Sequence, residues 1–557
     1  MNKQFGLKAL ASAIMLMSYE SVFAFTFETE SVHGNFDSTI TFGVGIRAKN
    51  PACDLILKDT SGTAPSGNSQ PAGAGAPLGC TEYNSSLGDQ GNLNYAKGDF
   101  FTTYLKGTHE LFLQLPENFK FMAAVSWLKD FTATRTTGYT SVGNPPDVGP
   151  LTDPARKDLN FKARLMDFWV SKEWSIGDQQ ARLRVGNQVI SWGESLFIPG
   201  GINQTNSMDY MRLSQPGTQL KEVFLPAPIV SFASGLGHGF NFEAYVQARW
   251  DDNYFPPTGS YWSVVNGVGK GSDAYGLPMY RAKNTGQYGA ALRYQPEGTE
   301  LNLGFYAMGY NDKSPQFSYN ANGTGAPGWI FMENRQMYGI SANFPIGDWA
   351  VGTELSYRPK EAVSLNPASG CTGNDGNCFA DTQKFQWHLT GLLSMTPSDY
   401  GWALNALGGA QTATVMAEAV VVSFPGLKKT YNGDPIASGA WNWGLETDPN
   451  GTPQAVGSKT SWGYNLDFSW VYDGSLISGW QVTPEIYYFQ AVKGRMPTLM
   501  NMFMEGAKSA NFAITFAQNP TTWQFGVNYA TFWGGKTVYD QPYKDRDYFG
   551  AYVSRNF

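Results

Sequence analysis

Charged residues are scarce in this sequence. Asp, Glu, Lys and Arg together make up 15% of its 557 residues, whereas an ordinary soluble domain carries about 25%. Aromatic residues also reach 15%, and there are 63 glycines. A membrane-spanning β-barrel has this composition, because its lipid-facing wall excludes charge while Tyr and Trp collect at the two interfaces. A large soluble secreted all-β protein would share the glycine and the aromatics, and it is the alternative.

The sequence also lacks long apolar runs. Beyond the N-terminal segment there is no stretch of about 18 apolar residues, so we expect no membrane-spanning helix. The formal net charge of -7 argues against a nucleic-acid partner, which would require a basic patch. The mean hydropathy of -0.30 fits a wall in which lumen-facing polar residues alternate with lipid-facing apolar ones.

Only four histidines are present, His33, His109, His238 and His388. An enzyme embedded in the wall, such as a phospholipase or protease, needs a histidine close to a serine or an aspartate. The chain contains neither the G-x-S-x-G nucleophile motif nor the H-E-x-x-H zinc motif. We therefore predict a protein that is not an enzyme and that has no catalytic, cofactor-binding or metal-binding residues.

Cysteines number only four, and they occur in two Gly/Pro/Ser-rich stretches. Cys53 and Cys80 lie in the first stretch, and Cys371 and Cys378 lie in the second. An oxidising periplasm would let each pair form a local disulfide. Metal binding is the competing interpretation, but the close Cys-x-x-Cys pairs or neighbouring histidines that it needs are missing.

The N-terminal segment is typical of a signal peptide. Lys3 and Lys8 supply the positive charges, and the apolar run at 10–17 is too short to span a bilayer. Small residues at Val22 and Ala24 predict cleavage after Ala24. The expected organisation is a signal peptide at 1–24 followed by a transmembrane β-barrel at 25–557.

Segments of about ten residues that alternate apolar and polar side chains predict tilted membrane-spanning strands. Tyr288 and Leu292 share one face and Arg293 the other, and Trp349 and Glu354 are divided in the same way. Nine long segments rich in Gly, Pro and Ser, the predicted external loops, alternate with tight turns at 116–118, 176–178, 236–239, 296–299, 345–348, 397–399 and 519–520. The pattern predicts an antiparallel barrel of about eighteen strands, with fourteen and sixteen left open because strand ends are uncertain.

The last residues form an amphipathic strand that ends on an aromatic residue. Phe549, Ala551, Val553 and Phe557 share one face. This ending resembles the signal read by the outer-membrane assembly machinery, although Arg555 stands where an aromatic residue is common. Together with the signal peptide, it predicts the outer membrane of a Gram-negative bacterium as the location.

The third predicted external loop differs from the others, because it mixes many apolar residues with ionisable ones. A solvated loop would have no need of so many apolar side chains. We expect the loop, at 192–222, to fold into the lumen and act as a constriction or, alternatively, as a plug. Its charges would have to be paired or hydrated. The predicted constriction or binding residues are Trp192, Glu194, Asn203, Asp209, Arg212, Lys221 and Glu222.

A second local feature is a methionine cluster near the sixteenth predicted strand. Methionine adapts to varied apolar shapes. The cluster could therefore be an apolar entrance for hydrophobic solutes, or it could be a loop packed beneath its neighbours, which we favour. Its methionines are Met496, Met500, Met502 and Met504.

Several motifs resemble the pattern of a Gram-negative family catalogued as domain of unknown function 1302. They are GNQVISWGES from Gly186, IPGGIN from Ile198, a PG and an LKE motif within 216–222, and DRDYFGAYV from Asp545. The resemblance covers essentially the whole mature chain. It implies an outer-membrane barrel, commonly found with a lipoprotein-like companion and with exporters of the resistance-nodulation-division type, and suspected of moving lipids, steroids or aromatic compounds. It brings no catalytic residues.

Three functions fit these observations. The first is a channel for hydrophobic or aromatic molecules, the second a hydrophilic porin with a charged constriction, and the third a non-conducting partner of an envelope exporter. Apolar residues in the third loop and the methionine cluster favour the first, whereas Arg212, Lys221 and the two glutamates suit the second. The expected partners are outer-membrane lipids, the assembly machinery, a small-molecule solute and an envelope transporter.

Overall fold

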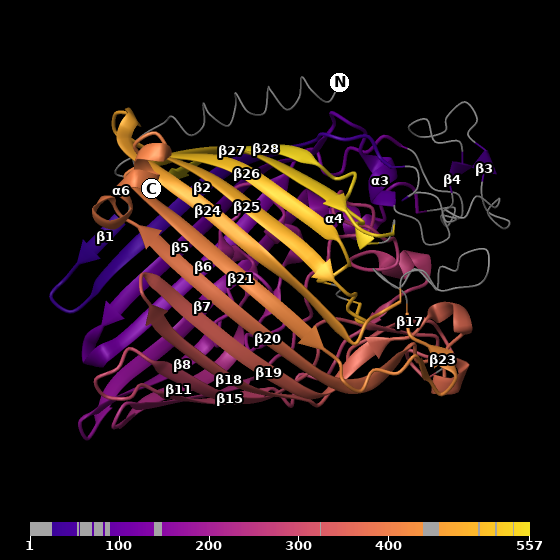
Figure 1. Cartoon of the computed structure of the whole chain (residues 1–557), viewed down its shortest axis with the longest axis horizontal. Coiled ribbons are helices and arrows are strands. Elements are labelled where there is room, and N and C mark those ends of the chain that lie inside the picture. The colour runs from indigo at the N-terminus through magenta and orange to yellow at the C-terminus, as the bar shows by residue number, and fades with distance from the viewer. Residues whose placement is uncertain are drawn as a thin grey trace.

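The computed structural model describes residues 25–52, 55, 70–71, 82–83, 90–138, 148–323, 325–437, 456–499, 502–518, 521–537 and 540–557. The predicted signal peptide, Cys53, Cys80 and Met500 lie outside these residues. Eighteen antiparallel strands form one closed barrel, which confirms the predicted fold class and strand count (Figure 1). In the described part of the chain, no helix has the length and apolar character needed to cross a membrane.

Each barrel strand pairs with its neighbours in chain order, and the last strand closes the ring by pairing with the first between Thr39↔Asn556 and Arg47↔Tyr548. The barrel strands are β2 (His33–Arg47), β5 (Phe100–Leu115), β6 (Phe119–Asp130), β7 (Phe161–Ile176), β8 (Gln179–Gln188), β11 (Ala227–Gly237), β12 (Phe240–Gln247), β14 (Tyr288–Tyr294), β15 (Asn302–Tyr310), β18 (Arg335–Ile346), β19 (Trp349–Ser364), β20 (Phe379–Met395), β21 (Thr412–Ser423), β24 (Thr460–Ile477), β25 (Trp480–Lys493), β26 (Ala507–Gln518), β27 (Trp523–Gly534) and β28 (Tyr548–Asn556).

The remaining elements are short and are not strands of the closed ring. β1 (Phe25–Glu28) pairs with the start of β2. The other short strands are β3 (Gln70–Pro71), β4 (Glu82–Tyr83), β9 (Ser207–Met208), β10 (Phe224–Leu225), β13 (Met279–Tyr280), β16 (Gln316–Ser318), β17 (Gly328–Ile330), β22 (Thr430–Tyr431) and β23 (Asp434–Pro435). The helical segments are α3 (Gln90–Asn94), α4 (Asp153–Asn160), α5 (Tyr210–Leu213), α6 (Pro397–Ala406), η2 (Pro116–Asn118), η3 (Leu220–Glu222), η4 (Ser272–Tyr275), η5 (Pro367–Ser369) and η6 (Thr372–Asn374).

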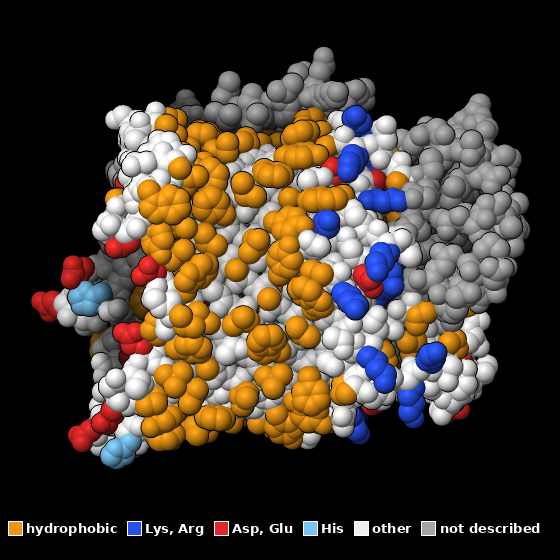
Figure 2. Space-filling model, in the orientation of Figure 1, with side chains coloured by type: hydrophobic (Ala, Val, Ile, Leu, Met, Phe, Trp, Pro, Cys, Tyr) orange, Lys and Arg blue, Asp and Glu red, His pale blue; other side chains and the backbone are white. Residues whose placement is uncertain are grey.

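The outer face of the wall carries a belt of apolar side chains (Figure 2). Tyr288, Phe305 and Ile340 are each about half exposed on this face, whereas Arg293 approaches Glu243 in the interior. The predicted alternation therefore separates lipid-facing from lumen-facing residues. In the view of Figure 2, Lys and Arg gather at the rim that carries the long loops, and most Asp and Glu lie at the opposite rim.

One predicted turn is wrong. A tight turn was expected at 397–399, but the chain forms helix α6 there before β21 begins. Proline is favoured in the first turn of a helix, where its missing N–H costs no hydrogen bond, so Pro397 starts a helix here rather than closing a hairpin. The hydroxyl of Tyr400 donates to Asp348 in the adjacent turn at 2.6 Å, which ties α6 to the rim.

Cys371 and Cys378 form a disulfide in the loop between β19 and β20, with their Cα atoms 5.2 Å apart. This confirms one of the two predicted pairs. Both cysteines are buried and pack in an apolar cluster with Ile198 of the third external loop and Met496. The disulfide therefore belongs to the apolar cluster that contacts the part of the third external loop inside the barrel.

Candidate functional site

The third external loop, residues 189–226 between β8 and β11, runs through the barrel interior. Within it, β9 pairs with β10, and the short helix α5 follows β9. Asp209 caps α5, because its carboxylate accepts the backbone N–H of Arg212 at 2.8 Å, as preferred N-cap residues do. We call residues 194–202 the near limb and residues 209–222 the far limb.

Two wall glutamates hold the near limb through its backbone. Glu354 of β19 accepts the N–H groups of Glu194 and Ile202 at 2.6 and 2.8 Å. Glu418 of β21 accepts three further N–H groups, at 3.3, 2.6 and 2.8 Å, from Leu196, Phe197 and Ile198. Both carboxylates are about 1% exposed. Hydrogen bonds to buried charged groups are stronger than neutral ones, so these contacts fix the path of the limb.

His388 of β20 lies between Glu354 of β19 and Glu418 of β21. Its Nδ1 is 2.7 Å from Glu418, and its Nε2 is 2.8 Å from the Gln386 amide. Gln386 donates to the carbonyl of Pro199 at 3.0 Å. The histidine is fully buried, and its contact with Glu418 positions that carboxylate.

Close packing explains Gly201 in the near limb and Gly193 just before it. A Cβ on Gly201 would lie 1.9 Å from a carboxylate oxygen of Glu354, and Gly193, at a φ of 90°, faces the same carboxylate at 2.2 Å. Any side chain at either position would displace Glu354. The two glycines therefore let the backbone approach the wall closely enough for the hydrogen bonds to form.

Ion pairs between side chains hold the far limb. Glu222 accepts from Lys106 of β5 at 2.5 Å and lies 3.4 Å from Arg212. Lys221 pairs with Glu110 of β5, and Asp209 pairs with Arg164 of β7. Burial alone would raise the pKa of Glu222, but Lys106 and Arg212 outweigh burial and hold the pKa below its usual range. The carboxylate is therefore ionised at neutral pH.

Trp192 and Glu194, two of the predicted site residues, also contact the wall through their side chains. The indole N–H of Trp192 donates to Glu243 at 2.8 Å, and its ring packs against Tyr245 and Tyr306. The side chain of Glu194 accepts from Asn343 at 3.2 Å. Burial raises the pKa of Glu194, although the Asn343 hydrogen bond opposes the shift.

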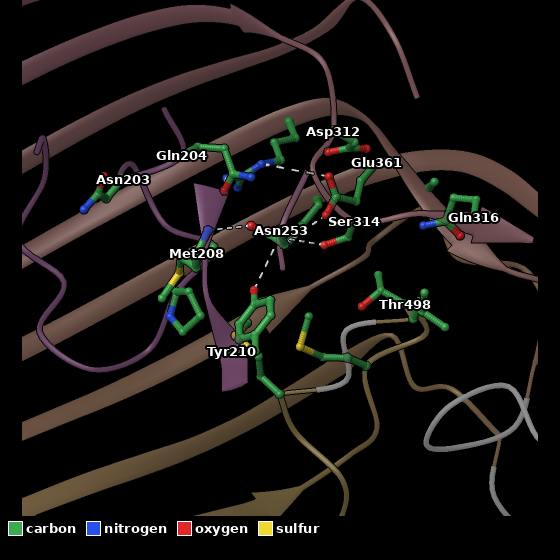
Figure 3. Close-up of a pocket in the computed structure, with 18 of the residues that line it drawn as sticks. Asn203, Gln204, Met208, Tyr210, Asn253, Asp312, Ser314, Gln316, Glu361 and Thr498 are labelled. Atoms are coloured by element: carbon green, nitrogen blue, oxygen red, sulfur yellow. Dashed lines mark hydrogen bonds and ion pairs between the residues drawn. The ribbon is translucent and has the colours of Figure 1, made fainter. Parts of the chain in front are cut away.

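A cavity of about 120 Å³ lies between the near limb, the fourth and fifth external loops, the wall and the methionine cluster (Figure 3). It brings together Asn203 and Met502, which the sequence analysis had selected independently. Met496 also lines it, whereas Met504 is buried in the cluster that contains the disulfide. Packing thus accounts for Met504, and Met496 and Met502 also face the cavity. The other lining residues are Pro199, Gly200, Gln204, Asn206, Met208, Tyr210, Asn253, Asp312, Ser314, Gln316, Arg358, Glu361, Ala362, Lys384, Thr498 and Leu499.

Charged groups occupy one side of this cavity. Arg358 donates to the carbonyl of Gly201 at 2.8 Å and to the hydroxyl of Tyr310 at 3.0 Å. Lys384 pairs with Glu361 at 3.0 Å. Asp312, in the fifth external loop, is the second acid, and burial together with the Glu361 carboxylate raises its pKa to about 7. The charge of the cavity therefore changes near neutral pH.

No group of three or more His, Cys, Asp or Glu side chains in the described ranges could hold a metal ion. The ionisable side chains of the loop instead pair with wall residues or with each other.

A family model described as "Protein of unknown function (DUF1302)" matches residues 5–557. The chain belongs to this family. No curated protein matches it. Solved structures similar to this DUF1302 protein include OccAB1 of Acinetobacter baumannii, which is 10% identical over 94% of this chain and 96% of that chain, with a TM-score of 0.43. OpdK of Pseudomonas aeruginosa with vanillate is 8% identical over 94% and 98%, with a TM-score of 0.40. OmpF of Salmonella typhi in a complex with daunomycin is 8% identical over 96% and 100%, with a TM-score of 0.35.

Sequence reasoning selected the loop of this DUF1302 protein but missed the wall residues that hold it. Glu354, Glu418 and Lys106 each lie at a lumen-facing position within a long strand, and all are buried. A charge at such a position is a detectable signal, because the alternation predicts which face each residue occupies. The sequence gives no sign of which loop segment each charge meets.

Proposed function

We propose that this DUF1302 protein is an outer-membrane channel for small molecules, in which the third loop limits passage and the cavity beside it favours hydrophobic or aromatic solutes. The observation that carries the proposal is the near limb, which five backbone hydrogen bonds hold across the lumen. A loop that only covered the mouth of the barrel would have no need of buried anchors on β19 and β21.

The membrane location is supported by the apolar belt of a closed barrel. A closed antiparallel sheet pairs its backbone groups internally and can therefore stand in hydrocarbon. Phe305 and Ile340, which are paired on the adjacent strands β15 and β18, and Val527 on β27 are each close to half exposed and would contact lipid. Side chains of this type would make a soluble protein aggregate.

The preference for aromatic solutes is supported by the methionines that line the cavity. The cavity measures about 120 Å³, which is less than the roughly 150 Å³ of an apolar cavity that holds benzene, so only part of an aromatic solute would occupy it. Met496 and Met502 provide an adaptable apolar wall. Asn203 also lines the cavity, and its amide can bind a polar substituent.

A second candidate, the hydrophilic porin, is favoured by a different region. A hollow of about 350 Å³ separates the far limb from strands β25 to β28. Leu213 and Leu220 line its loop side, whereas Glu485, Asn511 and Asn528 line its wall. Polar solutes could follow that wall without entering the cavity.

Swelling of proteoliposomes separates the candidates. Benzenesulfonate and isethionate are both membrane-impermeant sulfonates, and only the first carries a ring. We expect benzenesulfonate to enter faster than isethionate. Equal entry would favour the hydrophilic porin, and entry of neither would indicate a non-conducting partner of an exporter.

Two matched variants test the role of the far limb. Leu213→Trp adds bulk to the hollow and should slow entry. Leu236→Trp places the same ring near the short turn between β11 and β12, at a residue 56% exposed compared with 55% for Leu213. Equal entry rates in both variants would contradict a limiting role for this loop.

A further inference from the structure

The outer half of β7 has a backbone edge without a strand partner. β7 pairs with β6 from Phe161 to Lys172. It pairs with β8 only from Phe168 onward, because β8 ends at Gln188 and the chain then turns into the barrel. Along 161–167, therefore, the described residues form no β-ladder on the β8 side. The Asn187 side chain donates to the carbonyls of Leu165 and Met166 there.

Three local features surround the place where this pairing ends. The register between β6 and β7 shifts at Ala123/Val125, so that Leu165 and Phe168 both reach the outer face. Gly186 has a φ of 136°, and a Cβ there would lie 2.2 Å from the Phe168 carbonyl. Pro226 and Pro228 flank the start of β11 and have no N–H to extend the sheet. Bulges and prolines of this kind interrupt a ladder locally while the rest of the barrel stays closed.

A hollow of about 590 Å³ lies at the interrupted edge. Some of its lining residues belong to the lipid-facing surface, since Leu165 is 54% and Phe168 48% exposed. Others lie in the barrel interior, among them Ser207 of the third loop and Tyr254 of the fourth. The hollow thus joins the outer face of the wall to the loops inside.

We propose that this hollow is a lateral binding site through which a small neutral apolar molecule passes between the barrel and the surrounding bilayer. The proposal deepens the proposed function and rests on it, since it gives a hydrophobic solute a route that does not cross the aqueous rim. Leu165, Phe168, Leu225 and the two prolines provide the apolar lining.

The charges around the hollow indicate a neutral ligand. Arg164 pairs with Asp209. Arg249 pairs with Asp251 at 2.8 Å, and Arg281 approaches both Asp251 and Asp252. Each charged side chain that lines the hollow therefore has an opposite charge beside it, and an ionic ligand would have to break one of these pairs.

A thin partition separates this lateral hollow from the cavity beside the near limb, which we call the central cavity. Met208 accepts the N–H of Tyr254 at 2.8 Å, and Tyr254 accepts the N–H of Tyr210 at 3.1 Å. Met208 and Tyr210 line the central cavity (Figure 3), whereas Ser207 and Tyr254 line the lateral hollow. The Arg164–Asp209 ion pair fastens this partition to β7, so that its release would connect the two spaces.

Photolabelling of the whole protein in proteoliposomes tests the site, with benzophenone as the probe. Benzophenone is neutral, apolar and photoreactive, and it inserts readily at methionine. Met166 lines the lateral hollow and is 5% exposed, so ordinary contact with lipid should leave it unlabelled. We expect adducts at Met166 by peptide mass spectrometry. Absence of such adducts would overturn the proposal, whereas failure of the swelling assay alone would overturn only the channel.

A matched pair of variants on β11 gives the control. Pro228→Trp fills the hollow, and labelling of Met166 should fall roughly tenfold, equivalent to about 1.4 kcal/mol of binding free energy. Val230→Trp adds the same ring two residues away, at a lipid-facing position outside the hollow, and should leave labelling unchanged. Equal labelling in both variants would overturn the proposal. Heat-modifiable gel mobility confirms that each variant folds, and Leu225→Trp replaces Pro228→Trp if it does not.

The partition is tested by Asp209→Asn, which removes the partner of Arg164. Labelling should then spread from Met166 to Met208 in the central cavity. Labelling confined to Met166 would show that the hollow binds the probe without leading into the barrel, and this would overturn the proposed passage.

Discussion

The two limbs of the third loop are held in different ways. Backbone N–H groups bind the near limb to Glu354 and Glu418. The far limb is bound mainly by side-chain ion pairs to Lys106, Glu110 and Arg164, with two wall hydrogen bonds to the carbonyls of Pro216 and Gly217. Backbone anchoring does not depend on which side chains the limb carries, so the near limb has a fixed shape that supports a cavity. The far limb depends more on charge, so a substitution in one of its ion pairs should loosen it.

The largest effect is expected for Glu222→Gln, because it leaves Lys106 and Arg212 as buried cations without their carboxylate. Removing one member of a buried ion pair costs about 3 to 5 kcal/mol. A urea unfolding curve measures this loss of stability. A cysteine placed at Leu213 should also react faster with an impermeant maleimide.

Glu173→Gln is the control for that variant. Glu173 also pairs with a lysine of the neighbouring strand, Lys120 at 2.8 Å, but both side chains are about one third exposed. Exposed pairs contribute roughly 0 to 1 kcal/mol. An equal loss of stability in the two variants would contradict the importance of burial at Glu222.

A smaller effect is expected for the double variant Cys371→Ser and Cys378→Ser. A disulfide that closes so short a loop contributes about 2 to 3 kcal/mol in the chain-entropy model. Because the disulfide belongs to the same apolar cluster as Ile198, the near limb should loosen while the far limb stays in place. Maleimide labelling of a cysteine at Leu196, compared with one at Leu213, checks this, and equal acceleration at both would show that the limbs are coupled.

Glu418→Gln tests the anchoring of the near limb directly. Its neutral amide oxygen still accepts hydrogen bonds, so part of the anchoring should survive. Hydrogen bonds to charged groups contribute about 1.5 to 3 kcal/mol each, and we expect a total loss near the lower end of that range. Faster labelling at Leu196 with no change at Leu213 is the expected result. Unchanged labelling at Leu196 would show that packing alone holds the near limb.

The smallest effect concerns pH. The raised pKa of Asp312, about 7 in the folded protein against an ordinary value of 3.8, means that folding favours the protonated acid. Stability should therefore decline as the pH rises from about 4 towards 7, and benzenesulfonate entry should be faster at pH 6 than at pH 8. The lowered pKa of Glu222 has the opposite effect on stability, because folding favours its ionised form. The far limb should therefore loosen only when the pH falls below 4.5.

Asp312→Asn distinguishes the titration of the Asp312 carboxyl from that of Lys313, whose pKa is lowered to about 8 by burial. The variant should remove both the decline in stability between about pH 4 and 7 and the difference in entry between pH 6 and 8. Unfolding midpoints over the first range and swelling rates at the two values of the second provide the measurement. A dependence that persists in the variant would assign it to another group.

Some features of the barrel could be predicted because their signals are local. The alternation around Tyr288 and Trp349 depends on the side-chain period of a strand, and the long loops stand out by composition. The turn at 397–399 could not be predicted, since proline is favoured both in turns and at helix starts. At the site, the mixed composition of 192–222 indicated an inward loop, but Glu354, His388 and Glu418 appeared only as polar residues within strands.

The sequence by itself determined the class of fold and the loop that differs from the others, and it predicted about eighteen strands, with fourteen and sixteen left open, and the one disulfide that the described residues include. Each of these depends on neighbours along the chain. Only the tertiary structure decided which residues meet. Leu196 and Glu418 are 222 positions apart, and their contact requires the register of every intervening strand and the closure of the ring between β28 and β2. A shift of one residue in any strand would turn its charges from the lumen to the lipid, so the site exists only where the whole barrel is in register.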